Sequence, residues 1–323
     1  VPGRAQGRFR IEKVIMLPSA DIKSAAAAVG FDRCGIARAT AVSGQRAAEL
    51  RAWLAEGCHG EMDYLARNVE KRLDPRLLVE GARTIVSVAL CYNPGEEAVS
   101  AEWHLARYAY GRDYHEVVKD RLRQMLALLS LEEGRDGRAF ADTAPIDEKY
   151  WAEQAGIGWR GRNSQIIIPG AGSYFVLGEL VLLDEADVYD RPAPNRCGTC
   201  RACLDACPGG ALLGDGRLDA RRCLSYLTIE HRGALPKELG AEMRGCFYGC
   251  DRCAEVCPWN QKAMTATCGD FLPRRAIADM KPADWTALTV EQYRALFKGS
   301  AVKRAKYEGL MRNIHLLRDA AEE

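Results

Sequence analysis

The sequence predicts an α/β protein that continues into a cysteine-rich segment and a short helical C-terminal part. Helical and strand patterns alternate between residues 20 and 183, and ten of the 13 cysteines lie between Cys197 and Cys268. Near the C-terminus, apolar residues recur at helical spacing. We therefore expect an α/β domain over residues 14–190, a cysteine-rich domain over 191–262 and a helical segment over 263–323.

The expected elements follow one another in a simple order. Ser19 is expected to cap the first helix, and Gly134 follows the end of the third. The triplet 93–95, Asn-Pro-Gly, marks a turn after a long apolar strand. Expected helices cover residues 19–29, 43–57, 113–131, 145–155, 289–297 and 302–320, and expected strands cover residues 31–37, 83–92, 138–141, 165–168 and 174–183. The segment 189–194 holds two prolines without periodicity, so we place a domain boundary there.

Composition narrows the class of protein. The 323 residues are 48% hydrophobic, and 45 Lys and Arg balance 44 Asp and Glu, so whole-chain charge gives no attraction toward nucleic acid or membrane. Apolar runs are too short to span a bilayer, and no signal-peptide pattern opens the sequence, so we expect a cytoplasmic protein. We expect a monomer, because no exposed apolar seam is evident. Residues 1–10 are left out of the fold prediction.

The first cysteine array is C-x-x-C-x-x-C-x-x-x-C-P, the run that bacterial ferredoxins use for [4Fe–4S] clusters. In that run three cysteines hold one cluster and the fourth reaches the other cluster. Zinc is the alternative, but structural zinc sites usually split into two separated cysteine pairs. The array consists of Cys197, Cys200, Cys203 and Cys207.

The second array, C-x-x-C-x-x-x-C-P, lacks the first cysteine of that run. Either Cys223 or Cys246 can complete it, and we favour Cys223 because a ligand beyond a loop can approach from the open side. The crossing rule then predicts two ligand sets in one ferredoxin-like domain. The first set is Cys197, Cys200, Cys203 and Cys257, and the second is Cys207, Cys223, Cys250 and Cys253.

Several further motifs resemble the cobalamin-dependent epoxyqueuosine reductase family, in the family's order from about residue 20 to the end. They are RYAYGRDYH at 107–115, DTAP at 142–145, AEQAGIGW at 152–159, GRN at 161–163, RCLSYLT at 222–228, YGCD at 248–251 and CPWN at 257–260. The resemblance implies an enzyme that reduces the epoxide of epoxyqueuosine at the tRNA wobble position to queuosine. Electrons from an external donor would pass through two [4Fe–4S] clusters to a base-off cobalamin in the N-terminal domain.

The resemblance also implies roles for individual residues. Asp142 matches the family's proton donor, and we expect burial against the corrin to raise its pKa. A helix N-cap before Pro145 is the alternative role for Asp142. Positions that contact cobalamin in relatives are Arg72, Asp142, Asn163, Ser164, Leu177 and Ser225. Basic residues that could follow an RNA backbone, or could simply be solvated charges, include Arg222, Arg232, Lys303 and Arg304.

Other motifs receive a structural interpretation. Glycines 156, 158 and 161 fit a dinucleotide fingerprint, but they follow a helix, so we expect them to let the backbone approach a large cofactor. His115 begins a D-x-H motif, yet Val118 stands where that cobalamin motif needs glycine, so we expect a polar helix-start residue. The rival functions are a reductive dehalogenase-like corrinoid enzyme, a ferredoxin-like electron carrier and a cobalamin chaperone.

Overall fold

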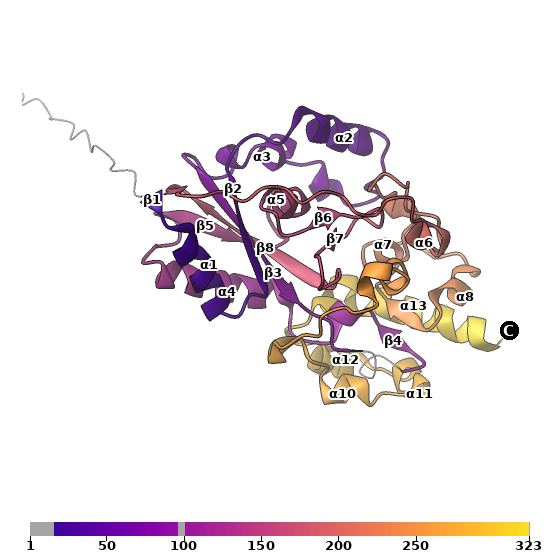
Figure 1. Ribbon diagram of the computed structural model, residues 1–323. Helices are drawn as coiled ribbons and strands as arrows, with labels where there is room; N and C mark the ends of the chain where they lie inside the picture. Colours follow the sequence, from indigo (N-terminus) through magenta and orange to yellow (C-terminus); the bar gives the residue numbers. More distant parts are fainter. Residues whose placement is uncertain (1–15, 96–100, 323) are drawn as a thin grey trace, which may run out of the picture.

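The computed structural model of the protein describes residues 16–95 and 101–322 (Figure 1). Residues 1–10, and residues 14 and 15 at the start of the expected N-terminal domain, lie outside the described residues. A four-stranded sheet forms the centre of the N-terminal half, with strand order β2-β3-β8-β5 and every neighbouring pair antiparallel. Its strands are β2 (Arg33–Arg38), β3 (Thr84–Cys91), β5 (Gly137–Phe140) and β8 (Phe175–Leu182).

Helices cover both faces of this sheet, as the alternating pattern predicts (Figure 1). The helices α1 (Ser19–Ala28) and α4 (Tyr114–Leu128) share an apolar cluster with Val86, Val88 and Leu90 of β3. On the other face, Ile85 and Val181 pack with the helices α2 (Gly44–Ala55), α3 (Val69–Leu73) and α5 (Glu148–Gln154). All eight residues of β3 are buried, which explains its continuous apolar run.

Most expected elements of this half are present, with ends that differ by a few residues. The expected cap of the first helix is wrong: Pro18 precedes the helix, and Ser19 is its first residue. The expected helix 302–320 is divided, because residues Ala301–Ala305 form a 3-10 turn and Lys306 has φ +60° before the final helix continues. The expected strand 165–168 is a short β7 (Ile166–Ile167) that pairs with β6 (Trp159–Arg160).

The second half consists of short helices around the cysteine arrays and a longer C-terminal helix. A parallel pair of β4 (His104–Leu105) with β10 (Cys246–Tyr248) joins the two halves, and β1 (Met16–Leu17) pairs with β9 (Glu185–Ala186). The helices are α6 (Ala202–Asp205), α7 (Leu224–Ile229), α8 (Leu239–Met243), α9 (Arg252–Glu255), α10 (Arg275–Ala278), α11 (Pro282–Thr286), α12 (Val290–Leu296) and α13 (Lys306–Glu322). The described 3-10 turns are Asp63–Leu65, Pro75–Leu77, Arg107–Ala109, Ala220–Arg222, Pro258–Asn260, Gly269–Phe271 and Ala301–Ala305.

Apolar packing crosses the expected domain boundaries. Phe247, Trp285 and Phe297 belong to one buried cluster that also includes Leu105 and Tyr110 from the N-terminal half. Conversely, Phe271 packs with the core that α1 and α4 form. The domain limits therefore stay a prediction, and the cysteine-rich segment is held from both sides.

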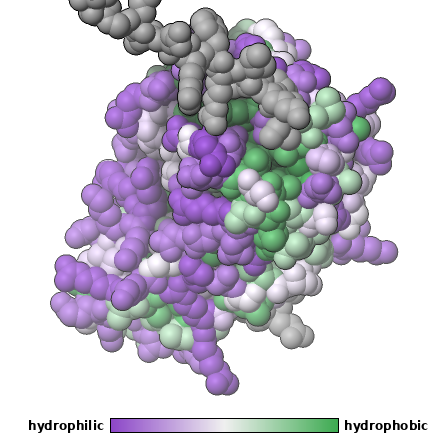
Figure 2. Space-filling model, turned by 90° about the vertical axis from the view of Figure 1, so that its left-hand side faces the viewer, coloured by the Kyte–Doolittle hydropathy of each residue, from purple (hydrophilic) through white to green (hydrophobic). Residues whose placement is uncertain are grey.

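On the face shown in Figure 2, hydrophilic residues cover the left of the view and a continuous hydrophobic area lies right of the centre. Within the described ranges, no helix combines the length and apolarity that crossing a membrane would need.

Candidate iron–sulfur and acid site

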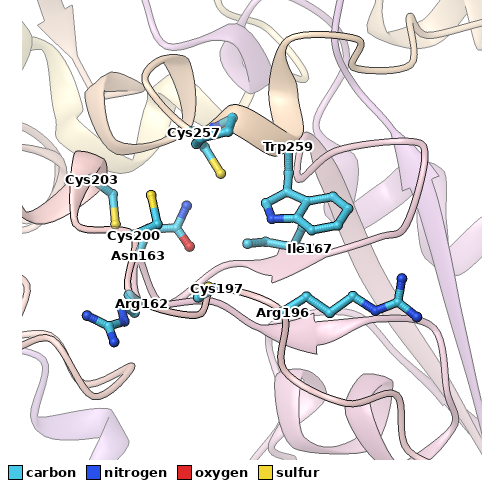
Figure 3. Close-up of a pocket in the computed structure, with 10 residues that line it drawn as sticks. Arg162, Asn163, Ile167, Arg196, Cys197, Cys200, Cys203, Cys257 and Trp259 are labelled. Carbon is cyan, nitrogen blue, oxygen red and sulfur yellow. The ribbon is translucent and has the colours of Figure 1, made fainter.

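Four cysteines from both arrays line one cavity of about 140 Å³. They are Cys197, Cys200, Cys203 and Cys257, so the last cysteine of the second array lies with three from the first. Figure 3 shows the sulfur atoms of Cys200, Cys203 and Cys257 pointing toward a common space. Trp259 and Ile167 form an apolar wall of this cavity, and Trp159 packs edge-on against Trp259 at 4.8 Å between ring centroids.

The spacing of these thiols suits a group larger than one metal ion. Zinc would draw four sulfur atoms to about 2.3 Å from a common point. Among residues 16–95 and 101–322, no three His, Cys, Asp or Glu side chains converge closely enough to hold a single ion. The four thiols instead surround a cavity, as cubane ligands do.

A second cysteine group lies beside the first. The thiols of Cys250 and Cys253 interact electrostatically with those of Cys207 and Cys223, so one crossing cysteine and one loop cysteine join this group. Cys246 interacts with Cys250 but points its Sγ toward the carbonyls of Tyr248 and Gly249, at 3.4 and 3.7 Å. The arrangement thus brings together the eight expected ligands and leaves Cys246 at the edge.

The remaining four cysteines have other neighbours. Cys268 is buried in the core formed by α1 and α4, with its Sγ 2.8 Å from Nη2 of Arg121. Cys34 packs against that core, and Cys91 ends β3. Cys58 lies beside Arg221, at 3.9 Å.

Three polar side chains fix the loops that carry the second group. The amide of Asn313 in α13 donates to the carbonyls of Thr228 and Phe247, at 2.8 and 3.0 Å, and so joins α7 to β10. Asp251 accepts the backbone N–H of Arg107 at 2.7 Å. Asn260 accepts the N–H of Ser173 and donates to the carbonyl of Ala254. Because buried hydrogen bonds are costly to lose, these contacts define the loop positions.

Asp142 follows β5 and is the centre of a polar cluster. Tyr114 donates its hydroxyl to Oδ2 of Asp142 at 2.5 Å, and Nε2 of His115 lies 3.1 Å from the same oxygen. The backbone of Asp142 has φ +54°, a left-handed conformation that costs energy and often occurs at functional sites. Its side chain is 55% exposed, so it remains open to a ligand. The cap of α5 is Asp147, which rules out the alternative role for Asp142.

His115 and Asp142 each stabilise the charged form of the other. Burial alone would lower the pKa of His115, but hydrogen bonds to Asp113 and Asp142 outweigh it and raise that pKa to about 9. Desolvation alone would raise the pKa of Asp142, but hydrogen bonds from His115 and Tyr114, with the charges of His115 and Lys149, lower it. The expectation of a raised Asp142 pKa refers to burial against the corrin and stays a prediction; in the protein alone the neighbours stabilise the carboxylate and lower its pKa.

The raised carboxyl pKa belongs to a neighbour. Burial and the charge of Asp142 raise the pKa of Glu148 to about 8, while one of its oxygens accepts the N–H of Asp142. Glu179, on the face of β8 that meets α5, is fully buried, and its own pKa is raised well above the ordinary value by burial and by Glu148. Oε2 of Glu179 has no partner among the described residues unless a proton lies between the two carboxyl groups. This pair therefore holds a proton at neutral pH.

Lys149 connects the acid cluster to the second cysteine group. Its Nζ donates to the carbonyl of Ser164 at 2.7 Å, and its charge acts on both Asp142 and Cys223. Ser164 has φ +62°, a second strained position next to this cluster. The charge of Lys149 therefore acts both on the acid and on a cysteine of the second group.

The expected cofactor contacts fall into two groups. Arg72 is half-buried, donates to the carbonyl of Ile146 at 3.1 Å and keeps a buried Nε without a partner in the described part of the chain. Ser164 and Ser225 keep part of their surface exposed. By contrast, Asn163 and Leu177 are only 3% and 8% exposed, so their side chains have little surface left for a ligand.

Asn163 belongs to the first cavity instead. It lines that cavity and donates from Nδ2 to the carbonyl of Cys253, at 3.4 Å. Nearby glycines also serve the fold: a Cβ at Gly158 would lie 2.2 Å from the carbonyl oxygen of Ile167, and one at Gly156 would lie 2.6 Å from that of Arg191. These two glycines are therefore required by close packing of the protein's own backbone, and the expected approach to a cofactor stays a prediction.

Two of the four residues of the expected basic surface have internal partners. Arg304 forms two 2.8 Å contacts with the carboxylate of Glu230, and Arg232 donates to the carbonyls of Arg304 and Ala305. Lys303 and Arg222 are exposed and have no ion-pair partner within the residues described. Only these two are therefore left with an available charge.

Several residues of this site were not found from the sequence. The sequence indicates only a polar helix-start role for His115. Its contacts with Asp113 and Asp142 arise because α4 folds onto β5. Glu179 had a detectable signal, because it is the one charged residue in the strand FVLGELVL. Lys149 and Glu148 gave no signal beyond helix-compatible polarity.

Two groups of four cysteines beside a half-exposed acid define a redox-active iron–sulfur protein. Residues 196–260 match the model of the 4Fe-4S double cluster binding domain, and residues 72–143 match that of Epoxyqueuosine reductase QueG, DUF1730. Epoxyqueuosine reductase of Cyclobacterium marinum is 43% identical over 304 residues, which cover 93% of this chain and 96% of that relative. The chain belongs to the epoxyqueuosine reductase family.

Solved structures agree with this assignment. A crystal structure of epoxyqueuosine reductase with an epoxyqueuosine-modified tRNA-Tyr stem loop has a TM-score of 0.84 and 28% identity, covering 92% of this chain and 80% of that one. The Bacillus subtilis enzyme, described with its catalytic aspartate loop swung out of the active site, has a TM-score of 0.81 and 28% identity, with the same coverage. Family membership excludes the interpretation of this chain as a mere electron carrier.

Proposed function

We propose that this protein reduces the epoxide of epoxyqueuosine at the wobble position of tRNA to queuosine. The observation that carries the proposal is Asp142, a half-exposed acid in a strained backbone position, held by Tyr114 and His115 and linked through Lys149 to the second cysteine group. The relative solved with a modified stem loop supports the substrate class. We further propose that the enzyme works as a monomer in the cytoplasm.

The eight cysteines of the two groups are proposed to hold two [4Fe–4S] clusters. Arg72, Ser164 and Ser225, with Asp142, are proposed to contact a base-off cobalamin; the unpaired Nε of Arg72 fits a polar acceptor on such a group. Asn163 and Leu177 support this site from the buried side. When bound, the clusters would deliver single electrons from an external donor, and cobalamin would supply a strongly reducing centre.

The side chains of the protein itself are proposed to store and transfer the protons that the reaction consumes. Removing the epoxide oxygen as water requires two electrons and two protons, and the opening ring places negative charge on oxygen. His115, which is protonated at neutral pH, holds the proton, and Asp142 is positioned to relay it to that oxygen through their 3.1 Å contact. Asp113, 2.6 Å from the other imidazole nitrogen, keeps the ring oriented and charged.

For the RNA, Lys303 and Arg222 are the proposed phosphate contacts among the expected residues, because both are exposed and unpaired within the residues described. Arg232 and Arg304 are proposed to shape this surface through their carbonyl and carboxylate contacts.

The test is conversion of an epoxyqueuosine-containing anticodon stem loop by the anaerobically reconstituted protein with cobalamin and dithionite, followed by mass spectrometry of the nucleosides. We expect loss of one oxygen mass, which Asp142→Asn abolishes and Asp215→Asn, a surface control, leaves intact. A protein with verified clusters and bound corrinoid that leaves the nucleoside unchanged would overturn the proposal.

A further inference from the structure

Arginines gather at the first cysteine cavity and along the loop that carries its cysteines: Arg162 and Arg196 line the cavity, and Arg191 and Arg201 lie on the same loop as Arg196. Residues 191–204 contain Arg191, Arg196 and Arg201 but no Asp or Glu, and all three arginines are exposed. A fourth arginine, Arg162, lines the cavity and donates to the carbonyl of Gly198 in the same loop, at 2.8 Å. These four residues are called the arginine rim below. In Figure 3 the side chains of Arg162 and Arg196 extend in opposite directions, away from the sulfur atoms.

The charge of the rim is largely uncompensated. Among the described residues, its only ion pair within 4 Å joins Arg201 to Asp205 at 3.6 Å, with both side chains about two-thirds exposed. The other three arginines of the rim have no carboxylate within 4 Å in the described part of the chain, so their charges are not offset by an ion pair. Since the whole chain carries only +1, this rim is a local positive patch on a nearly neutral protein.

The patch lies where electrons can enter most easily. Of the 13 cysteines, all of them described, only Cys200 is exposed, and it belongs to the first cavity. The second cysteine group lies toward Lys149 and Asp142, where the chemistry is proposed. A carrier that binds the arginine rim would therefore meet the end of the electron path that is farther from the substrate.

We infer that the arginine rim is the docking surface for a small acidic one-electron carrier protein. This inference rests on the proposed function, because it takes the first cavity to hold a cluster. Each encounter moves one electron from the reduced carrier, which is oxidised by one electron, to the group in the cavity. Two encounters supply the two electrons that epoxide reduction consumes.

An RNA backbone is the other polyanion that such a patch could attract. The rim segment 191–204 has no aromatic residue on which bases could stack, whereas single-stranded nucleic acid sites usually combine basic and aromatic side chains. Charge complementarity between proteins mainly increases the association rate and the specificity, which is what a transient electron donor requires.

The experiment measures binding of an acidic bacterial flavodoxin to the reconstituted protein, together with stopped-flow bleaching of the iron–sulfur absorbance by the reduced flavodoxin. We expect Arg191→Glu/Arg201→Glu to weaken binding and slow bleaching by about tenfold or more, with a loss of salt dependence. Arg191→Lys/Arg201→Lys should retain wild-type behaviour, and Arg33→Glu, an exposed charge on β2, should change binding less than about twofold.

Two further measurements separate the possible failures. Dithionite-driven conversion of the stem loop should be the same in the wild type and in the Arg191→Glu/Arg201→Glu variant, because dithionite needs no docking surface. If the wild type itself does not convert the stem loop with dithionite, the proposed function is rejected, and not the docking surface. The stem loop should bind the Glu variant as tightly as the wild type. Reduced stem-loop affinity with unchanged flavodoxin binding would overturn the inference in favour of RNA, and unchanged binding of both would overturn it outright.

Discussion

Nε2 of His115 lies 3.1 Å from Oδ2 of Asp142, while Nδ1 of the same ring lies 2.6 Å from Asp113. An imidazole between two carboxylates keeps its proton to higher pH, here with a pKa of about 9. The pKa of Asp142 is correspondingly lowered. The transferable proton of this pair therefore resides mainly on the histidine at neutral pH, and the acid that faces the ligand draws on it.

The first prediction concerns the pH dependence of activity. Because His115 loses its proton near pH 9, single-turnover conversion of the stem loop should fall as the pH rises through that value. His115→Gln should move this fall to lower pH and reduce the rate at pH 7.5 by about tenfold or more. Asp113→Asn, which removes one carboxylate from the ring, should move the fall toward neutral pH but preserve the rate at pH 6.5. An alkaline limb unaffected by His115→Gln would contradict the proton-storage role.

The second prediction separates two neighbouring cysteines. Cys223→Ser should lose the second cluster, because the thiol interacts with those of Cys207, Cys250 and Cys253. Iron content should fall from about eight to about four atoms per chain, with a matching loss of absorbance. Cys246→Ser is the matched control and should keep both clusters, since its Sγ faces backbone carbonyls. The reverse pattern in iron content and electron paramagnetic resonance would reassign the fourth ligand.

The extent to which sequence predicts this molecule depends on how local each determinant is. The buried strands β3 and β8 and the helix α4 were predictable because apolar periodicity over eight or more residues reports directly on burial. The grouping of Cys257 with the first array was also predictable, because covalent spacing limits which thiols can surround one cluster. The strands and the helix depend on nearby residues, whereas the cysteine grouping depends on a ferredoxin-type motif with a known crossing pattern.

Other features arise from contacts between distant segments. The parallel pairing of β4 with β10 joins strands of two and three residues, which are too short to show any period. The lowered pKa of Asp142 in the protein alone depends on Tyr114 and His115, 28 and 27 residues away, so no local pattern in the sequence indicates it. Arg304 looked like a free charge in the sequence, yet Glu230 neutralises it across 74 residues.

The third prediction concerns stability and the buried pair of Glu148 and Glu179. A carboxyl group whose folded pKa is raised stabilises the fold below its unfolded pKa, and this contribution is lost as pH rises through the folded pKa. For Glu148 this stabilisation should be lost between the ordinary glutamate pKa of 4.5 and the raised pKa of about 8. The melting temperature of the wild type should therefore fall between pH 6 and pH 9, and this fall should be larger than that of the Glu179→Gln variant over the same range.

The Glu179→Gln variant lacks one of the two carboxylates that repel each other at high pH. At pH 9 its melting temperature should therefore be about 2 °C or more above that of the wild type. At pH 5.5 the two proteins should melt together. Glu185→Gln is the control, because Glu185 pairs with Arg83 at 3.2 Å near the surface and should show no gain at high pH. Parallel pH profiles for the wild type and Glu179→Gln would refute a shared proton.

The fourth prediction distinguishes two adjacent basic residues of the expected RNA surface. Lys303 is exposed and has no ion-pair partner in the described part of the chain, so Lys303→Ala should weaken stem-loop binding and reduce the slope of log affinity against log salt by about one. Arg304 is held by Glu230 and lies 5.4 Å from the ring of Tyr64, so Arg304→Ala should lower the melting temperature instead. Its salt slope should equal that of the wild type. Equal salt slopes for all three proteins would mean that Lys303 contacts no phosphate, and the RNA surface would then have to lie elsewhere.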